Sequence, residues 1–122
     1  MWRLTVLTVL SAVGCTLDPG RPPLARIEIT PAAIVENDGF QTAVTLDGTA
    51  SADPLDDPGG AISLEFSWQI LDDEVRFEGS RATSPAPMIR LRGDVPATII
   101  LTVTDRDGLA ATAVDHVQLT VR

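Results

Sequence analysis

The sequence predicts an all-β protein, an antiparallel sandwich of seven short strands, with no helix of useful length after the first fifteen residues. Two observations predict this fold. From residue 25 onward the hydrophobic residues recur with a period of two, which is the period of a strand with one buried face. Clusters of Asp, Asn, Gly and Pro separate the periodic segments and mark turns. Many short strands at this spacing are typical of a sandwich.

The strand at residues 62–70 has the strongest support, because apolar and polar residues alternate there without exception. Its apolar face carries Ile62, Leu64, Phe66, Trp68 and Ile70. Trp68 has the parity of its apolar neighbours, and we therefore expect it in the core. An exposed tryptophan that stacks on a sugar is the alternative interpretation.

Six further strands are predicted with shorter or weaker alternation. Residues 97–105 alternate clearly and are rich in β-branched residues, which favours a strand. In the last predicted strand, Val114 is out of phase with Val117, and a bulge near Asp115 and His116 would restore the register. The remaining predicted strands cover residues 26–29, 42–46, 76–77, 88–91 and 111–121.

The composition excludes several classes of protein. The chain has 122 residues, with 17 Asp and Glu against 9 Arg and no Lys, and its formal net charge is −8. It therefore lacks the clustered cations that a nucleic-acid partner needs. One Cys rules out an internal disulfide framework and a cysteine-based zinc site, and one His rules out a multi-histidine metal site. A chain of this length forms one domain with a modest core.

The first fifteen residues have the layout of a secretory signal. Arg3 precedes an apolar run at residues 4–10, and small residues follow the run. The run is too short to span a bilayer as a helix, which requires about 20 residues. A buried helix is the alternative, but the run has no polar face and is followed by Thr-Leu-Asp-Pro-Gly. We therefore expect a signal peptide at residues 1–14.

The only cysteine lies at the expected cleavage point. The segment Ala-Val-Gly-Cys at residues 12–15 resembles the bacterial lipobox, in which the cysteine becomes the lipidated N-terminus. This resemblance implies a lipoprotein of the bacterial cell envelope that is anchored in a membrane by acyl chains on Cys15. Thr16 stands where that family carries Asp for inner-membrane retention, which favours the outer membrane. Ordinary secretion and a free buried cysteine in an unprocessed chain are the alternatives.

A short segment rich in Pro and Gly precedes the periodic part of the chain. Residues 16–24 contain four Pro or Gly residues in nine, and such a stretch is extended and semi-rigid. We therefore expect residues 15–24 to form the lipidated end and linker of a single domain at residues 25–122.

Three segments of this domain match known motifs in order. They are residues 45–54 (TLDGTASADP), 62–68 (ISLEFSW) and 101–110 (LTVTDRDGLA). They resemble the LDGSASSDPDG stretch, the core-tryptophan strand and the LTVTDxxG hairpin of PKD domains, which are polycystic kidney disease-type Ig-like modules. The resemblance implies a PKD-type, Ig-like β-sandwich over residues 25–122, with Trp68 in its core.

The sequence contains no motif of a catalytic site. HExxH, GxSxG, the P-loop and a dinucleotide-binding turn are absent, and the single histidine, His116, lies in the last predicted strand. We therefore predict a non-catalytic, membrane-tethered extracytoplasmic module that binds or spaces an envelope protein or a surface polymer. Carbohydrate sites need exposed aromatic residues, and with Trp68 buried only Phe40 and Phe77 remain as candidates.

Acidic residues gather in the predicted loops and support a second interpretation. Loop carboxylates are suitable ligands for Ca²⁺, which takes about six to eight oxygen atoms. Some PKD domains bind calcium through the loop aligned with Asp56 and Asp57, so the resemblance implies a calcium-stabilised structural module as the alternative function. Aspartates that stabilise turns by bonding to the backbone are the competing explanation. The candidate calcium ligands are Asp53, Asp56, Asp57, Asp72 and Asp73.

Overall fold

The computed structural model describes residues 21–53, 64–71 and 74–121, and this part of the chain is all β. The predicted signal peptide and most of the predicted linker lie outside it. No helix long and apolar enough to cross a membrane occurs among the described residues. Eight strands are present in them: β1 (Glu28–Thr30), β2 (Ala33–Val35), β3 (Ala43–Asp47), β4 (Glu65–Leu71), β5 (Val75–Phe77), β6 (Met88–Leu91), β7 (Ala97–Thr104) and β8 (Ala110–Thr120).

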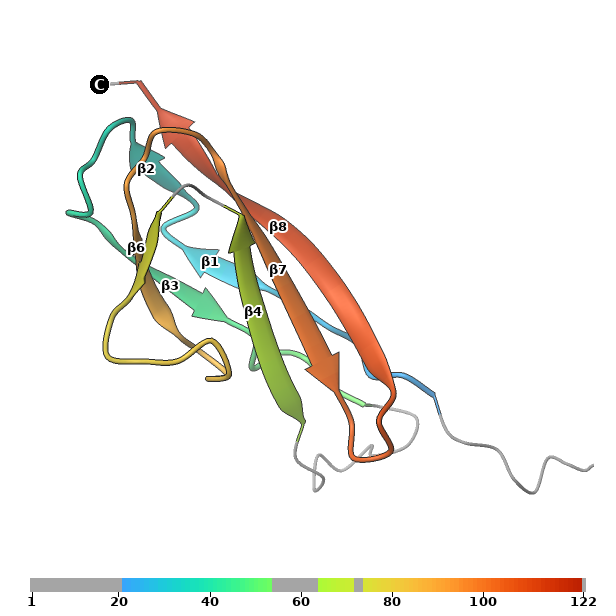
Figure 1. The fold of residues 1–122 in the computed structure, drawn as a ribbon. Helices are drawn as coiled ribbons and strands as arrows, with labels where there is room; N and C mark the ends of the chain where they lie inside the picture. The colour runs from blue at the N-terminus through green and yellow to red at the C-terminus, as the bar shows by residue number, and fades with distance from the viewer. Residues whose placement is uncertain (1–20, 54–63, 72–73, 122) are drawn as a thin grey trace, which may run out of the picture.

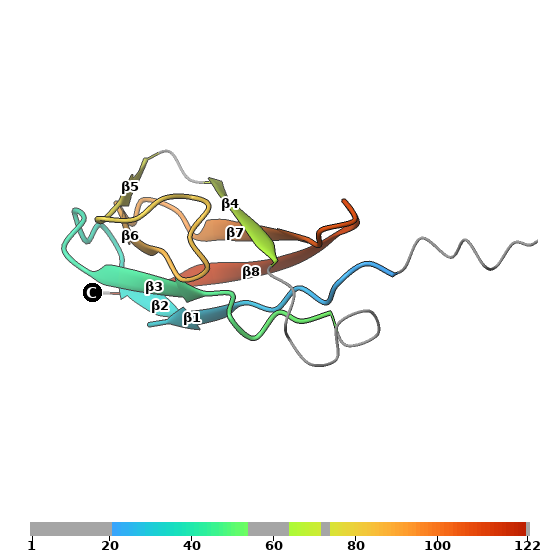
Figure 2. The same ribbon diagram turned by 90° about the horizontal axis from the view of Figure 1, so that it is seen from below.

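The strands form two layers that pack face to face (Figure 1, Figure 2). One sheet has the order β1-β3-β6-β5 and the other has the order β2-β8-β7-β4. Neighbouring strands are antiparallel, except that β2 and β8 run parallel. This division of strands between two sheets is the Ig-type arrangement. The predicted all-β, Ig-like sandwich is therefore confirmed.

The prediction of seven strands missed β2. This strand has three residues and pairs with the far end of β8. The chain leaves the first sheet after β1 and enters the second at β2, across a cis peptide bond between Thr30 and Pro31. β2 is as short as β1 and β5, but its residues follow Pro31 and Ala32 as an unbroken run of small and apolar side chains, so no period of two is visible there. The N-terminal part of the domain therefore supplies one edge strand to each sheet, β1 to the first and β2 to the second.

The predicted bulge near Asp115 and His116 is wrong. β7 and β8 pair in one continuous register over all 8 residues of β7. The regular ladder turns Val114 outward, and its side chain is 57% exposed. The prediction assumed that an apolar residue in a strand must face the core, whereas single apolar side chains are common on protein surfaces.

The core lies between the sheets and is built from the inward-facing residues of both. Trp68 of β4 is 4% exposed, which confirms its prediction as a core residue. Its Nε1 donates a hydrogen bond of 2.7 Å to the backbone carbonyl of Ser84, so the only polar atom of the buried ring has a partner. A Cβ atom on Gly48 would lie 3.0 Å from this ring, so a side chain there would press on the indole. The fully buried side chains include Val44, Leu46, Ile89, Leu91, Ile99, Leu101, Val103 and Val117.

Replacement of Trp68 by alanine is expected to lower the free energy of unfolding by about 3–5 kcal/mol, because it removes a large buried ring. It also leaves the carbonyl of Ser84 without its donor. Urea unfolding followed by circular dichroism measures the change. Trp68→Phe keeps most of the apolar contact and should lose less. Unchanged stability of the alanine variant would contradict the core position of the ring.

Candidate functional site

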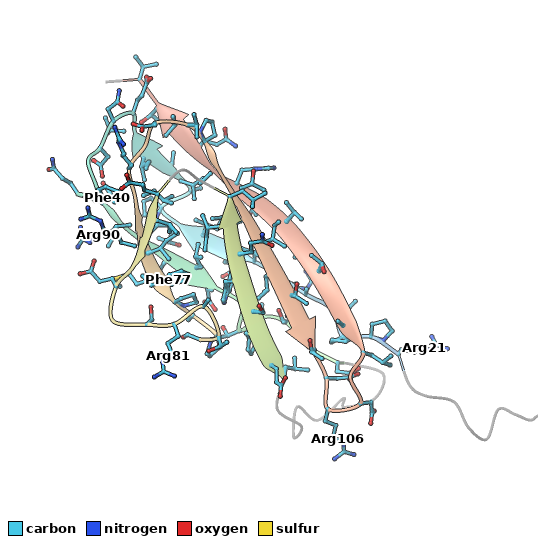
Figure 3. The ribbon with its side chains drawn as sticks, in the orientation of Figure 1. Arg21, Phe40, Phe77, Arg81, Arg90 and Arg106 are labelled. Atoms are coloured by element: carbon cyan, nitrogen blue, oxygen red, sulfur yellow. The ribbon has the colours of Figure 1, made fainter. Side chains whose placement is uncertain are left out.

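A groove of about 470 Å³ lies beside the antiparallel pair of β5 and β6. Figure 3 shows Phe40 and Arg90 close together beside β6. These two residues are 50 positions apart in the sequence, so the groove exists only in the folded chain. We refer to it as the β5–β6 groove, and its lining residues are Phe40, Arg76, Phe77, Glu78, Gly79 and Arg90.

The register of β5 and β6 places two arginines on the outer face of the sheet. Arg76 of β5 lies directly opposite Arg90 of β6. Strand alternation turns Val75 and Phe77 towards the core and leaves Arg76 exposed. Residues in this position have Cβ atoms about 4.5–5.5 Å apart, and like charges at that separation destabilise a sheet. Contacts with other groups would offset this repulsion.

Arg90 is engaged by the chain itself. Its Nε forms an ion pair with the carboxylate of Glu78. Its Nη1 donates hydrogen bonds to the backbone carbonyls of Phe40, at 3.0 Å, and of Gln41, at 2.7 Å. Arg90 thereby ties the loop between β2 and β3 to the surface of β6, which gives this arginine a structural role.

The same loop presents the ring of Phe40. Gly39 and Phe40 both have a positive φ, of 67° and 69°, which produces the tight reversal of the chain. Asp38 Oδ2 accepts a hydrogen bond of 2.6 Å from the backbone N–H of Thr42, which closes the turn. The N–H of Gly39 donates to the carbonyl of Arg92 at 3.1 Å. These contacts hold Phe40 beside the β5–β6 pair.

Arg76 differs from Arg90, because its guanidinium contacts an aromatic ring and no carboxylate of the described residues. Its Cζ lies 3.8 Å from the centroid of the Phe40 ring, which is a cation–π contact. The ion pairs found in the described part of the chain involve other arginines. The groove therefore contains one arginine that is neutralised by Glu78 and one, Arg76, that these residues leave without an opposite charge.

The two aromatic residues that sequence reasoning named for carbohydrate contact, Phe40 and Phe77, both line this groove. Both are half-buried, and Phe77 also packs against the core. Sequence reasoning did not name Arg76, Glu78 or Arg90. A signal for the two arginines was available, because each occupies a polar position of a predicted strand, but only the strand register shows that they lie opposite each other.

The predicted calcium ligands are mostly outside the described residues, and so is the predicted lipidation site, Cys15. Asp53 is described and is 7% exposed. In residues 21–53, 64–71 and 74–121, no group of three or more His, Cys, Asp or Glu side chains is arranged to hold a metal ion. The calcium site therefore stays a prediction. The ligands that lie outside are Asp56, Asp57, Asp72 and Asp73.

Two aspartates of the sequence motifs stabilise turns. Asp105 is 5% exposed, and its Oδ1 accepts hydrogen bonds of 2.9 Å from the backbone N–H groups of Asp107 and Leu109. Its Oδ2 is buried without a hydrogen-bond partner among the described residues. Asp47 Oδ1 accepts bonds from the hydroxyl and the backbone N–H of Thr49, at 2.6 and 2.8 Å. The hydroxyl bond, followed by the backbone bond, lowers the pKa of the Asp47 carboxyl.

Replacement of Asp105 by alanine leaves two backbone donors of its turn without their acceptor and is expected to lower the free energy of unfolding by about 1–3 kcal/mol. Asp107→Ala in the same turn is the matched control, because this side chain is exposed. It should change stability by no more than about 0.5 kcal/mol. Denaturant unfolding of both variants measures the difference, and equal losses would contradict the role of Asp105.

Comparison with known proteins identifies solved structures of the same fold. No protein-family model matches the chain, and no curated protein matches it. A carbohydrate-binding module of the β-sandwich superfamily, studied for its promiscuous specificity, is 20% identical over 84% of this chain, with a TM-score of 0.60. A nucleoside hydrolase-related protein of Saccharophagus degradans, associated with carbohydrate metabolism, is 20% identical over 83% of this chain, with a TM-score of 0.59. The match spans 36% of the first of these chains and 26% of the second.

A third solved structure matches along nearly its whole length. The PKD domain of the KIAA 1837 protein is 18% identical, with a TM-score of 0.54, and the match covers 93% of both chains. Likeness at these identities concerns the fold, and it agrees with the two sheets and their strand order. The chain therefore has a PKD-like Ig fold, as its three sequence motifs predict.

Proposed function

We propose that the protein is a non-catalytic binding module that contacts a surface polysaccharide through the β5–β6 groove, while a lipid on Cys15 tethers it to the bacterial cell envelope. The observation that carries this proposal is that Phe40 and Arg76 line one groove and stack on each other there. An aromatic ring supplies apolar contact area with fixed geometry. A guanidinium supplies a planar set of donors for sugar oxygens.

The position of the groove supports the proposed tether. Figure 3 shows Arg21 at one end of the sandwich, with Phe40 and Arg90 towards the other end. A lipid on Cys15, which precedes Arg21 in the chain, would bring the Arg21 end closest to the membrane. The groove would then face away from the membrane and remain accessible to a polymer at the cell surface.

Two further observations favour a polysaccharide ligand without catalysis. The single histidine, His116, is exposed on β8, and its Nδ1 lies 3.3 Å from the hydroxyl of Thr98. Among the described residues, no carboxylate is hydrogen-bonded to the imidazole, so this pair has no third member of the kind that activates a nucleophile there. Of the structural neighbours, one is a carbohydrate-binding module and another belongs to a protein associated with carbohydrate metabolism. These likenesses support a sugar polymer as the ligand in preference to an envelope protein.

Affinity electrophoresis of the full chain, in detergent, through gels that contain neutral or acidic polysaccharides tests the proposed function. At least one polymer should retard the protein, and Phe40→Ala should weaken the binding about two- to tenfold, because a ring contact contributes about 0.5–1.5 kcal/mol. Val114→Ala is the control, since it truncates an apolar side chain that is 57% exposed on the other sheet. The proposal fails if no polymer retards the protein, or if both variants weaken binding equally.

The lipid tether has its own test. In the expressing bacterium, a Cys15→Ser chain is expected to incorporate no labelled fatty acid, because the thioether has no sulfur on which to form. It should also leave the membrane fraction, since acyl chains supply the membrane affinity of such anchors. Equal retention of the wild-type and serine chains in washed membranes would contradict the tether without affecting the polysaccharide test.

A further inference from the structure

We infer that the β5–β6 groove is specific for the carboxylate groups of an acidic polysaccharide, and that Arg76 is the residue that binds them. This inference rests on the proposed function and narrows its ligand from polysaccharides in general to polymers of uronate type. Three observations carry it: the arginine pair opposite each other on β5 and β6, the ring contact of Arg76, and the unequal engagement of the two guanidinium groups.

The charged side chains that line the groove leave one positive charge in excess. Arg90 and Glu78 neutralise each other as an ion pair, and Arg76 remains. The chain as a whole carries a net charge of −8, so the positive charge of the groove is opposite in sign to the net charge of the protein. A hydroxyl or amide side chain could bind a neutral sugar as well as a guanidinium does. A carboxylate, in contrast, forms a charge-assisted hydrogen bond with the guanidinium.

The contact with Phe40 prepares Arg76 for a ligand. The guanidinium lies against the ring at 3.8 Å, which restricts the rotamers of a long side chain before any ligand arrives. Less conformational entropy is therefore lost on binding. The edge of the planar guanidinium can form two parallel hydrogen bonds with one carboxylate. Phe40 is in this respect a positioning residue for Arg76.

Neighbouring arginines are less suited to this role. Arg90 already donates from Nε and Nη1 to Glu78 and to two backbone carbonyls. Arg92, two residues further along, forms ion pairs with Asp94 at 2.9 Å and with Glu74 at 3.8 Å. A carboxylate on Arg76 would also reduce the repulsion between the opposed guanidinium groups of Arg76 and Arg90.

Two forms of one polymer test the inference. The full chain, in detergent, is assayed by biolayer interferometry on immobilised polygalacturonate and on the same polymer after methyl esterification, which removes the charge and keeps the backbone. The wild-type chain is expected to bind the acidic form about tenfold more tightly, because hydrogen bonds to charged groups exceed neutral ones. Arg76→Gln should abolish this preference.

The matched control is Arg106→Gln, which makes the same change of net charge in the turn between β7 and β8. Figure 3 shows Arg106 well away from Phe40 and Arg90, and its side chain is exposed. This variant should keep the preference for the acidic form. Arg76→Lys, which keeps the charge without the planar fork, should keep part of it. Thermal melts of all variants verify that each is folded.

Each result decides the question. Equal binding of the wild-type chain to both forms, or binding to neutral polymers but not to polygalacturonate, overturns the carboxylate specificity and leaves polysaccharide binding standing. An equal loss in the Arg106→Gln and Arg76→Gln variants also overturns it, because net charge alone would then explain the effect. No binding to any polysaccharide overturns the proposed function and this inference together.

Discussion

From its position between the two sheets, Trp68 links them through two hydrogen bonds. Its indole N–H donates to the carbonyl of Ser84 at 2.7 Å, and its backbone N–H donates to the carbonyl of Ala82 at 2.8 Å. Both acceptors belong to the connection between β5 and β6, so one residue of β4 joins its sheet to that connection. The connection is also closed by Ser80, whose hydroxyl accepts a bond of 3.0 Å from the N–H of Met88. The β5–β6 pair, and the groove beside it, are therefore held in place from the core.

At the groove, the β5–β6 pair places Arg76 opposite Arg90, and a strand pair with only a structural role would avoid such like charges. Arg90 is explained by the fold, because its bonds to the carbonyls of Phe40 and Gln41 hold the loop between β2 and β3. Arg76 has no comparable bond within the described residues and contacts the ring of Phe40. An apolar side chain would cover that ring without opposing Arg90 across the ladder. An arginine at this position is therefore better explained by a ligand than by the stability of the sheet.

Local patterns in the sequence predicted the features of the structure that are themselves local. Alternation over consecutive residues was enough to place Trp68 in the core, but it failed at Val114, because parity does not show whether an apolar side chain is covered. β2 could not be predicted, since its residues show no polar alternation and are defined as a strand only by pairing with β8. At the site, Phe40 could be named from composition alone. The placement of Arg76 directly opposite Arg90 could not be predicted, because it depends on the register of β5 and β6 and not on any local pattern.

The net charge of −8 is compatible with an anionic ligand, because salt limits the reach of the other charges. At physiological ionic strength the Debye length is about 8 Å, so acidic side chains beyond that distance act weakly on a carboxylate in direct contact with Arg76. The remaining repulsion slows association and keeps a single contact weak. With the proposed lipid tether, a polymer that repeats the carboxylate would engage several modules on one surface, and effective concentration would then raise the total affinity without any new contact. With Arg76 left without an opposite charge by the described residues, the proposed site would therefore favour polymeric anions over small free ones.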